Sequence, residues 1–324
     1  MLAPNVIAVE QLPLLRDAVA PATAVEPIVV GDHRIRVGTC GYSYRDWLGR
    51  FYPERLPSRE MLGFYARHFG VVEIDSSYYR VPTVATCASL ARRTPDGFIF
   101  TAKAPGSLTH VPADVDAPSL EDAGPFREAL QPLATEGKLG PVLLQFPNAF
   151  RPTARAERHL ERLADALGGL ALVAEFRHRD WQGPATLDLL ARLGIGWCNV
   201  DEPRFESLLH PSGDVVGDVA YVRFHGRNAK MWWKGDASER YEYAYAAEEL
   251  EPWTARVGDM ASAARETYGK KLSFPDYYRP SFSADELAQI VAATGDVARR
   301  FGYDVAAIAQ RVAAPSPEPT SISS

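Results

Sequence analysis

The feature that most constrains the fold of this chain is a recurring pair of elements, a short apolar run followed by a helical pattern. Seven runs are typical of β-strands, at residues 35–41, 71–77, 98–104, 141–147, 170–178, 195–201 and 219–226. Helical patterns lie between most of them, at 58–69, 84–93, 119–135, 153–168 and 184–193. Strands that recur about every 25 to 45 residues with helices between them predict right-handed βαβ units and a parallel sheet.

Polar residues lie at the C-terminal ends of five of these runs: Glu73, Asp75, Lys103, Gln145, Glu175, Arg177, Arg223 and His225. A barrel brings all strand ends into one ring, whereas an open doubly wound sheet gathers ligands at one switch point. No Gly-x-Gly-x-x-Gly motif follows the first run, which weakens the dinucleotide-binding alternative. The pattern therefore favours an α/β fold of the TIM-like (β/α) barrel type. Its eighth strand is uncertain, because the candidate KKLSF at 270–274 is short and poorly apolar.

The sequence predicts a single TIM-barrel-like domain over residues 35–310. Residues 1–34 are rich in Ala, Pro and Val and are expected to form a partly disordered extension, and residues 311–324 a flexible tail. The chain shows neither a secretion signal nor an apolar run long enough for a membrane span. Its 3 cysteines are far apart in the sequence. We therefore expect a cytoplasmic protein with reduced thiols and no membrane partner.

Several long motifs occur in the order typical of one family: GTCGYSYRDWLGRFYPERLP (38–57), FYARHFGVVEIDSSYYRVP (64–82), FIFTAKAPGSLTH (98–110), LLQFPNAF (143–150), AEFRHRDW (174–181), YVRFHGRNAKMWWKG (221–235) and RYEYAYAAEELEPW (240–253). With these motifs the chain resembles the domain-of-unknown-function-72 (YecE-like) family from about residue 35 to 265. The resemblance implies a TIM-barrel-like fold and supplies no established reaction. Residues 267–282 lack the asparagine pair that relatives carry there, so the resemblance does not extend to the closing strand.

The strand ends predict a pocket of mixed charge in which neighbouring groups shift each other's pKa values. Arginine and lysine suit a phosphate or carboxylate, so Lys103, Arg223, Arg227 and Arg80 are candidates for holding an anion. His225, flanked by arginines, is expected to be a neutral base, with Glu175 or Glu73 as its acid partner. The remaining residues predicted to bind the ligand are Asp75, Tyr79, Arg177, Trp181, Asp201, Asn228 and Trp232.

Two other interpretations of the same residues stay open. Glu73, Glu175, Asp201 and His225 are ligand types for a divalent metal, although Lys103, Arg177 and Arg223 on the same rim would repel a cation. The charges could also form a structural ion-pair network with no ligand at all. No metal or other cofactor is favoured.

Three functions follow. The first is an enzyme, a hydrolase or an acid–base catalyst, that acts on a phosphorylated or otherwise anionic small molecule. The second is a nucleic-acid-binding or nucleic-acid-processing protein that stacks bases on Trp47, Trp181 or Trp232. The third is a barrel that binds a ligand without catalysis. The net charge of -6 argues against a nucleic-acid grip spread over the surface and favours the small molecule.

Overall fold

Seven parallel strands form one sheet in the computed structural model, which describes residues 25, 28–30, 33–110, 117–217, 219–235, 240 and 242–268. The strands neighbour each other in chain order. They are β3 (Gly38–Cys40), β4 (Val71–Ile74), β5 (Ile99–Lys103), β6 (Leu139–Gln145), β7 (Leu172–Glu175), β8 (Ile195–Asp201) and β9 (Tyr221–Phe224). All seven predicted strands are confirmed, as is the parallel α/β architecture. Most strands are shorter than predicted because the chain leaves the sheet at the polar residues.

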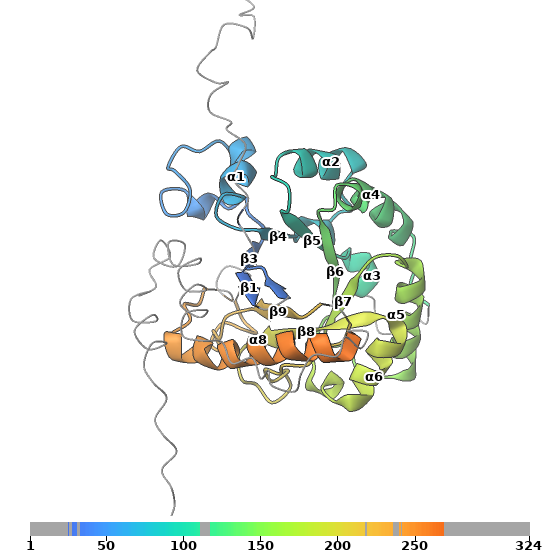
Figure 1. Ribbon diagram of the computed structural model, residues 1–324. Coiled ribbons are helices and arrows are strands. Elements are labelled where there is room, and N and C mark those ends of the chain that lie inside the picture. The colour runs from blue at the N-terminus through green and yellow to red at the C-terminus, as the bar shows by residue number, and fades with distance from the viewer. Residues whose placement is uncertain are drawn as a thin grey trace, which may run out of the picture.

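Helices lie outside the curved sheet, in chain order around it (Figure 1). The five predicted helices are α1 (Ser58–Tyr65), α2 (Val84–Arg92), α4 (Ala123–Thr135), α5 (Ala154–Ala166) and α6 (Pro184–Leu193). Four short helices that were not predicted follow the strand ends: η3 (Arg45–Trp47), η4 (Ser76–Tyr78), α3 (Gly106–Thr109) and η5 (Arg179–Trp181). The long helix α8 (Ala247–Tyr268) runs beneath β8 and β9 in Figure 1.

The sheet curls so that its last strand faces its early strands. Tyr221 on β9 donates a hydrogen bond from its hydroxyl to Glu73 Oε2 on β4, at 3.1 Å, and lies 3.1 Å from Thr101 Oγ1 on β5. These contacts cross the hollow of the sheet, since β9 hydrogen-bonds only to β8 within the sheet as described. The result is a curled half-barrel. The predicted eighth strand at 270–274 lies outside the described residues, so closure into a TIM-like barrel stays a prediction.

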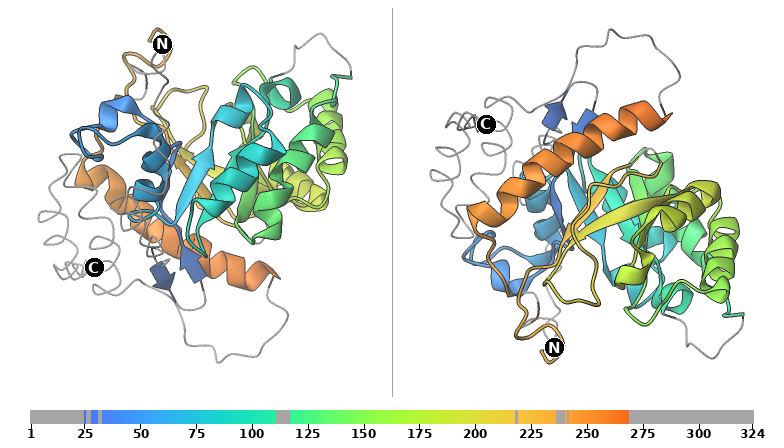
Figure 2. Two further views of the ribbon diagram at one scale, coloured as in Figure 1. Left: turned by 90° about the horizontal axis from the view of Figure 1, so that it is seen from above. Right: turned by 90° about the horizontal axis from the view of Figure 1, so that it is seen from below.

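The chain termini lie mostly outside the described residues. Within the predicted N-terminal extension, β1 (Ile28–Val30) and β2 (His33–Ile35) pair as an antiparallel hairpin. This hairpin lies beside α8 in both views of Figure 2. The rest of the extension before residue 25, the stretch 269–310 and the predicted tail 311–324 are not described.

Local sequence signals fix several helix ends. The Thr153 hydroxyl accepts a hydrogen bond from the Ala156 N–H at 3.2 Å, which is the N-cap expected for α5. Helix α6 ends at Gly194, whose φ of 65° is a left-handed conformation that favours glycine. After each helix ends, the chain enters the next strand of the sheet. Because all seven strands are parallel, their C-terminal ends lie on the same side of the sheet.

A stack of aromatic rings lies among the residues that follow β6 and β7. Phe176 stacks on Trp181 at 4.2 Å between ring centroids, and Phe150 stacks on Phe146 at 4.3 Å. The indole N–H of Trp181 donates to the Phe150 carbonyl at 2.7 Å. This packing joins the segments that follow β6 and β7.

Within the part of the chain that the structure covers, no helix combines the length and apolar character that crossing a membrane requires.

Candidate functional site

Six charged or titratable side chains meet at the C-terminal ends of β4, β7, β8 and β9. We call them the strand-end cluster: Glu73, Glu175, Arg177, Glu202, Arg223 and His225. All but Arg177 are buried, and Arg177 is half-buried. Parallel pairing aligns the strand ends in register, so residues far apart in sequence share one rim.

Arg223 lies at the centre of the strand-end cluster. Its Nη1 donates to Glu175 Oε2 at 2.6 Å and its Nη2 donates to Glu73 Oε1 at 2.7 Å. The same Nη2 contacts Cys40 Sγ at 3.1 Å. One guanidinium therefore joins three strands across the hollow of the sheet, and two carboxylates of the protein occupy it.

A second chain of contacts leads from Glu175 to Glu202. Arg177 Nε lies 2.7 Å from Glu175 Oε1, and Arg177 Nη1 donates to Glu202 Oε2 at 3.1 Å. His225 Nε2 lies 3.2 Å from Glu175 Oε1. Arg177 thus contacts both Glu175 and Glu202.

Protonation states within the cluster differ strongly. Burial would raise the pKa of Glu175, but Arg177 and Arg223 outweigh it and hold this pKa well below its ordinary value. Burial, Arg177 and Arg223 lower the pKa of His225 to about 3. The imidazole is therefore neutral at neutral pH, and Nε2 carries the proton that faces the ionised Glu175.

Glu202 is the exception among the carboxyl groups. Burial raises its pKa to about 7, with Arg177 opposing the shift and Glu175 adding to it. Its Oε1 is buried and has no hydrogen-bond partner among the described residues. A carboxyl group with this pKa can both give and accept a proton near neutral pH.

A more accessible group of residues lies at the ends of β4 and β5. We call it the Lys103 group: Asp75, Tyr78, Lys103 and His110. Lys103 Nζ lies 3.3 Å from Asp75 Oδ1 and 4.3 Å from the centroid of the Tyr78 ring. Burial, Lys103 and Arg177 lower the pKa of His110 to about 4. Both cations therefore lie close enough to His110 to disfavour its protonated form.

Asp201 belongs to a separate, structural group. Its buried carboxylate accepts four hydrogen bonds at 2.7–2.9 Å, two from Arg227, one from the Tyr245 hydroxyl and one from the Trp253 indole. Arg227 also contacts Glu249 Oε1 at 3.1 Å. We call these five residues the Asp201 latch. The latch fastens the segment after β9 and helix α8 to the end of β8.

Replacing Asp201 by asparagine is expected to loosen the latch. The variant keeps the shape of the side chain but loses the charge that Arg227 pairs with, so we expect the free energy of unfolding to fall by about 1–3 kcal/mol. Amide hydrogen exchange in α8 should accelerate more than in α5. Asp188→Asn, an exposed change in α6, is the control and should alter neither quantity. Unchanged exchange in α8 of Asp201→Asn would contradict a latching role.

The contacts of the strand-end cluster and of the latch bear on the residues predicted to hold an anion. The guanidinium groups of Arg223 and Arg227 both pair with carboxylates of the chain itself, so neither arginine is free to hold a ligand anion as expected. The carboxylate of Asp201 likewise accepts the hydrogen bonds of the latch, and its predicted role in ligand binding stays a prediction. The pKa of Glu175 is held well below its ordinary value, so this carboxyl group would have to gain a proton before it could act as the predicted acid partner. Arg177 also pairs with two carboxylates, Glu175 and Glu202, whereas Lys103 pairs with Asp75 at 3.3 Å, and these two are the predicted cations that lower the pKa of His110.

The predicted aromatic contacts also change. Trp181 and Trp232 are 1% and 4% exposed, so neither offers a ring face to a ligand. Trp47 is half-buried and packs against Phe51 and Tyr52. Trp233, which the sequence did not single out, is 55% exposed.

The remaining predicted residues are not members of the strand-end cluster. Tyr79 and Arg80 are exposed beyond η4. Asn228 is half-buried and donates to the Glu242 carbonyl at 3.4 Å. Asp75 pairs with Lys103.

The proposed metal ligands do not converge. Arg223 occupies the space between Glu73 and Glu175, and Asp201 faces Arg227 in the latch. Among the residues that the structure describes, no group of three or more His, Cys, Asp or Glu side chains is arranged to hold a metal ion. The alternative metal site built from Glu73, Glu175, Asp201 and His225 is therefore not formed by this arrangement.

Sequence reasoning missed Glu202 and Tyr221 as members of the site. Tyr221 shares the alternation of Arg223 and His225, so the strand periodicity was a signal for its inward direction. Glu202 follows the last residue of β8 and precedes Pro203, and only the burial of its carboxyl group in the fold distinguishes it from an exposed glutamate.

Comparisons with known proteins agree on one family. The family model described as "Protein of unknown function DUF72" matches residues 36–271. The UPF0759 protein YunF of Bacillus subtilis (strain 168) is 29% identical over 247 residues, which is 72% of this chain and 86% of that protein. A DUF72 family protein of known structure from Thermotoga maritima is 34% identical, with a TM-score of 0.63 over 71% of this chain and 88% of its own. Another from Enterococcus faecalis is 26% identical, with a TM-score of 0.61 over 70% and 84%.

Proposed function

The chain belongs to the DUF72 family of proteins of unknown function, and from this premise we propose that it is an enzyme that performs acid–base chemistry on a small anionic molecule at the strand ends. The observation that carries the proposal is the strand-end cluster. It holds buried Arg223 and half-buried Arg177 against three buried glutamates, and the pKa of one of these, Glu202, is about 7. Burying such a network is costly compared with an apolar core, which favours a functional reason for it.

Lys103 and Arg177 are the groups we propose to hold the anion. Each is half-buried, with a side chain 13% exposed, and both act on His110. Lys103 pairs with one carboxylate, Asp75, at 3.3 Å, and Arg177 pairs with Glu175 at 2.7 Å and with Glu202 at 3.1 Å. A ligand anion at these two cations would compete with Asp75 and Glu202 for them. A phosphate or carboxylate there would receive charge-assisted hydrogen bonds.

Glu202 is the group we propose to exchange a proton with the ligand. Its pKa of about 7 suits proton transfer at neutral pH better than the pKa of about 3 for His225. Glu73 and Glu175 then act as positioning residues, since their contacts run to Arg223 and Arg177. His225 acts with them through its contact with Glu175 at 3.2 Å. Arg177 connects the proposed anion site to the proposed proton-transfer group, because it contacts Glu202 and would also contact the bound anion.

The nucleic-acid alternative receives less support. Two of its three stacking residues, Trp181 and Trp232, are buried. Arg223 and Arg227, which would have held backbone phosphates, are paired inside the protein.

The proposal is tested by titrating inorganic phosphate into the wild-type protein and into Lys103→Met, with calorimetry as the readout. We expect phosphate to bind the wild type about ten times more tightly or better, because a hydrogen bond to a charged group is worth about 1.5–3 kcal/mol. Arg158→Met, an exposed change on α5, is the control and should bind as the wild type does.

Equal phosphate affinity of the wild type and Lys103→Met, or no binding to either, would overturn the proposal. An oligonucleotide titrated in parallel separates the alternative. Binding that is tight at low salt and falls steeply with rising salt would favour a nucleic-acid function instead.

A further inference from the structure

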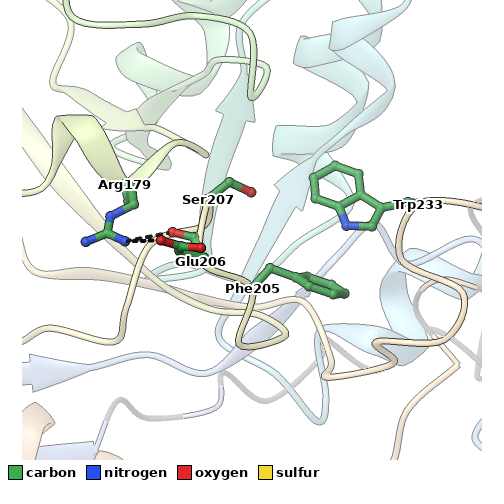
Figure 3. A pocket seen from close by; sticks show the side chains of 5 residues that line it. All are labelled: Arg179, Phe205, Glu206, Ser207 and Trp233. Carbon is green, nitrogen blue, oxygen red and sulfur yellow. Dashed lines mark hydrogen bonds and ion pairs between the residues drawn. The ribbon is translucent and has the colours of Figure 1, made fainter.

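A cavity of about 510 Å³, widely open to solvent, lies on the loops that follow β7, β8 and β9, and its lining residues are not members of the strand-end cluster. It is lined by Arg179, Phe205, Glu206, Ser207 and Trp233 (Figure 3). A volume of this size is within the range of sites that hold small molecules, about 300–1,000 Å³. The cavity therefore has room for a ring system, and its lining residues decide which kind.

The same three loops build both the cavity and the strand-end cluster. The loop after β7 supplies Arg177 to the cluster and Arg179 to the cavity. The loop after β8 supplies Glu202 to the cluster and Phe205 to the cavity. The segment after β9 supplies His225 to the cluster and Trp233 to the cavity. An isolated bridge between His178 and Leu208 joins the first two loops. Both sites are thus neighbours on one rim of the sheet.

Two aromatic rings form the apolar side of the cavity. Trp233 and Phe205 lie 5.8 Å apart between centroids at an interplanar angle of 47°. Trp181, Trp197, Trp232 and Trp253 are all buried, whereas Trp233 leaves more than half of its surface uncovered. The turn that presents it is fixed by a hydrogen bond from the Gly235 N–H to the Met231 carbonyl at 2.8 Å. An exposed indole on a fixed turn offers a flat face for stacking.

The opposite side of the cavity is polar and held in place. Arg179 Nη1 donates to the Glu206 carbonyl at 3.2 Å, and the Arg179 N–H donates to the Ser207 carbonyl at 3.1 Å. Figure 3 shows the Ser207 hydroxyl between this polar side and Trp233. The donors of Arg179 and the Ser207 hydroxyl can meet the polar edge of a ring whose face lies on the indole.

We propose that this cavity binds a planar aromatic or heteroaromatic ring carried by the anionic substrate, with Trp233 as the stacking residue. The inference rests on the proposed function, because it assigns the ring to the molecule whose anionic group lies at Lys103 and Arg177. The substrate class is then an anion with a flat ring attached, such as an aryl phosphate or a nucleoside phosphate.

The test compares four probes on the full-length protein: inorganic phosphate, cyclohexyl phosphate, phenyl phosphate and adenosine. We expect phenyl phosphate to bind about tenfold more tightly than inorganic phosphate, because stacking on an aromatic side chain adds affinity. Cyclohexyl phosphate, similar in size but not flat, should gain less. Binding of phenyl phosphate should quench tryptophan fluorescence.

Variants at Trp233 make the test specific. Trp233→Ala should lose the preference for phenyl phosphate and keep the affinity for inorganic phosphate, and Trp233→Phe should retain most of the preference. A preference that survives in Trp233→Ala, or phenyl phosphate binding no tighter than phosphate, would overturn the inference. If adenosine binds the wild type but not Trp233→Ala while phosphate binds neither, the ring site stands and the proposed function fails.

Discussion

Replacing Arg223 by methionine is expected to lower the free energy of unfolding by about 3–5 kcal/mol. Arg223 is buried and hydrogen-bonds to Glu73 and Glu175 at 2.7 and 2.6 Å. Methionine fills much of the volume but leaves both carboxyl groups buried without their shared cation. Their lost stabilisation, and not the loss of packing, accounts for most of the expected effect.

The measurement is urea unfolding of the wild type and of Arg223→Met at neutral pH. Arg158→Met is the matched control, since it removes an exposed arginine from α5 and should cost less than about 0.5 kcal/mol. Adding Glu175→Gln to Arg223→Met should recover part of the loss, because the pair is coupled. A loss below about 1 kcal/mol for Arg223→Met would contradict the central position of Arg223 in the cluster.

The second large effect concerns pH and Glu202. The folded protein raises the pKa of Glu202 from 4.5 to about 7, so folding favours the protonated carboxyl group. Its contribution to stability is complete below pH 4.5 and is lost as the pH rises through 7. Since a tenfold change in acid dissociation corresponds to about 1.4 kcal/mol, the loss is on the order of 3 kcal/mol.

Glutamine at position 202 cannot ionise, so Glu202→Gln is expected to lack this loss. The difference in unfolding free energy between Glu202→Gln and the wild type should move in favour of the variant between pH 5 and pH 8. The lowered pKa of His225 also makes stability depend on pH, since its neutral form contributes fully above pH 6.5 and less as the pH falls towards 3. That dependence is common to both proteins and cancels in the difference.

Urea unfolding at several pH values measures this difference. Glu157→Gln, an exposed change on α5, serves as the control and should differ from the wild type by a constant amount. A constant difference for Glu202→Gln as well would show that Glu202 is ionised in the folded protein at neutral pH, and would remove its proposed role in proton transfer.

The strands of the sheet could be predicted from the sequence because the signals for strands and helices are local. Each strand is a short apolar run, and each helix between strands has its own pattern and ends, such as Thr153 at the start of α5 and Gly194 after α6. Polar residues at the strand ends were also readable, and the placement of Glu73, Glu175, Arg177, Arg223 and His225 at one rim follows from parallel pairing.

The pairing of charges could not be read in the same way. Arg223 and Arg227 look alike in YVRFHGRN, yet Gly226, with a φ of 78°, turns the chain between them. Arg223 therefore enters the cluster, while Arg227 joins Asp201 in the latch. The sequence also could not show which of the neighbouring tryptophans is exposed. Trp232 is buried and Trp233 is exposed because of the turn that carries them.

The most direct measurement is a crystal structure of the protein grown with phosphate. The expected result is a phosphate within hydrogen-bonding distance of Lys103 Nζ and the Arg177 guanidinium, beside His110 and within reach of Glu202. Crystals in which phosphate is ordered elsewhere, while Lys103 stays paired with Asp75 and this space holds only water, would contradict an anion site at the strand ends.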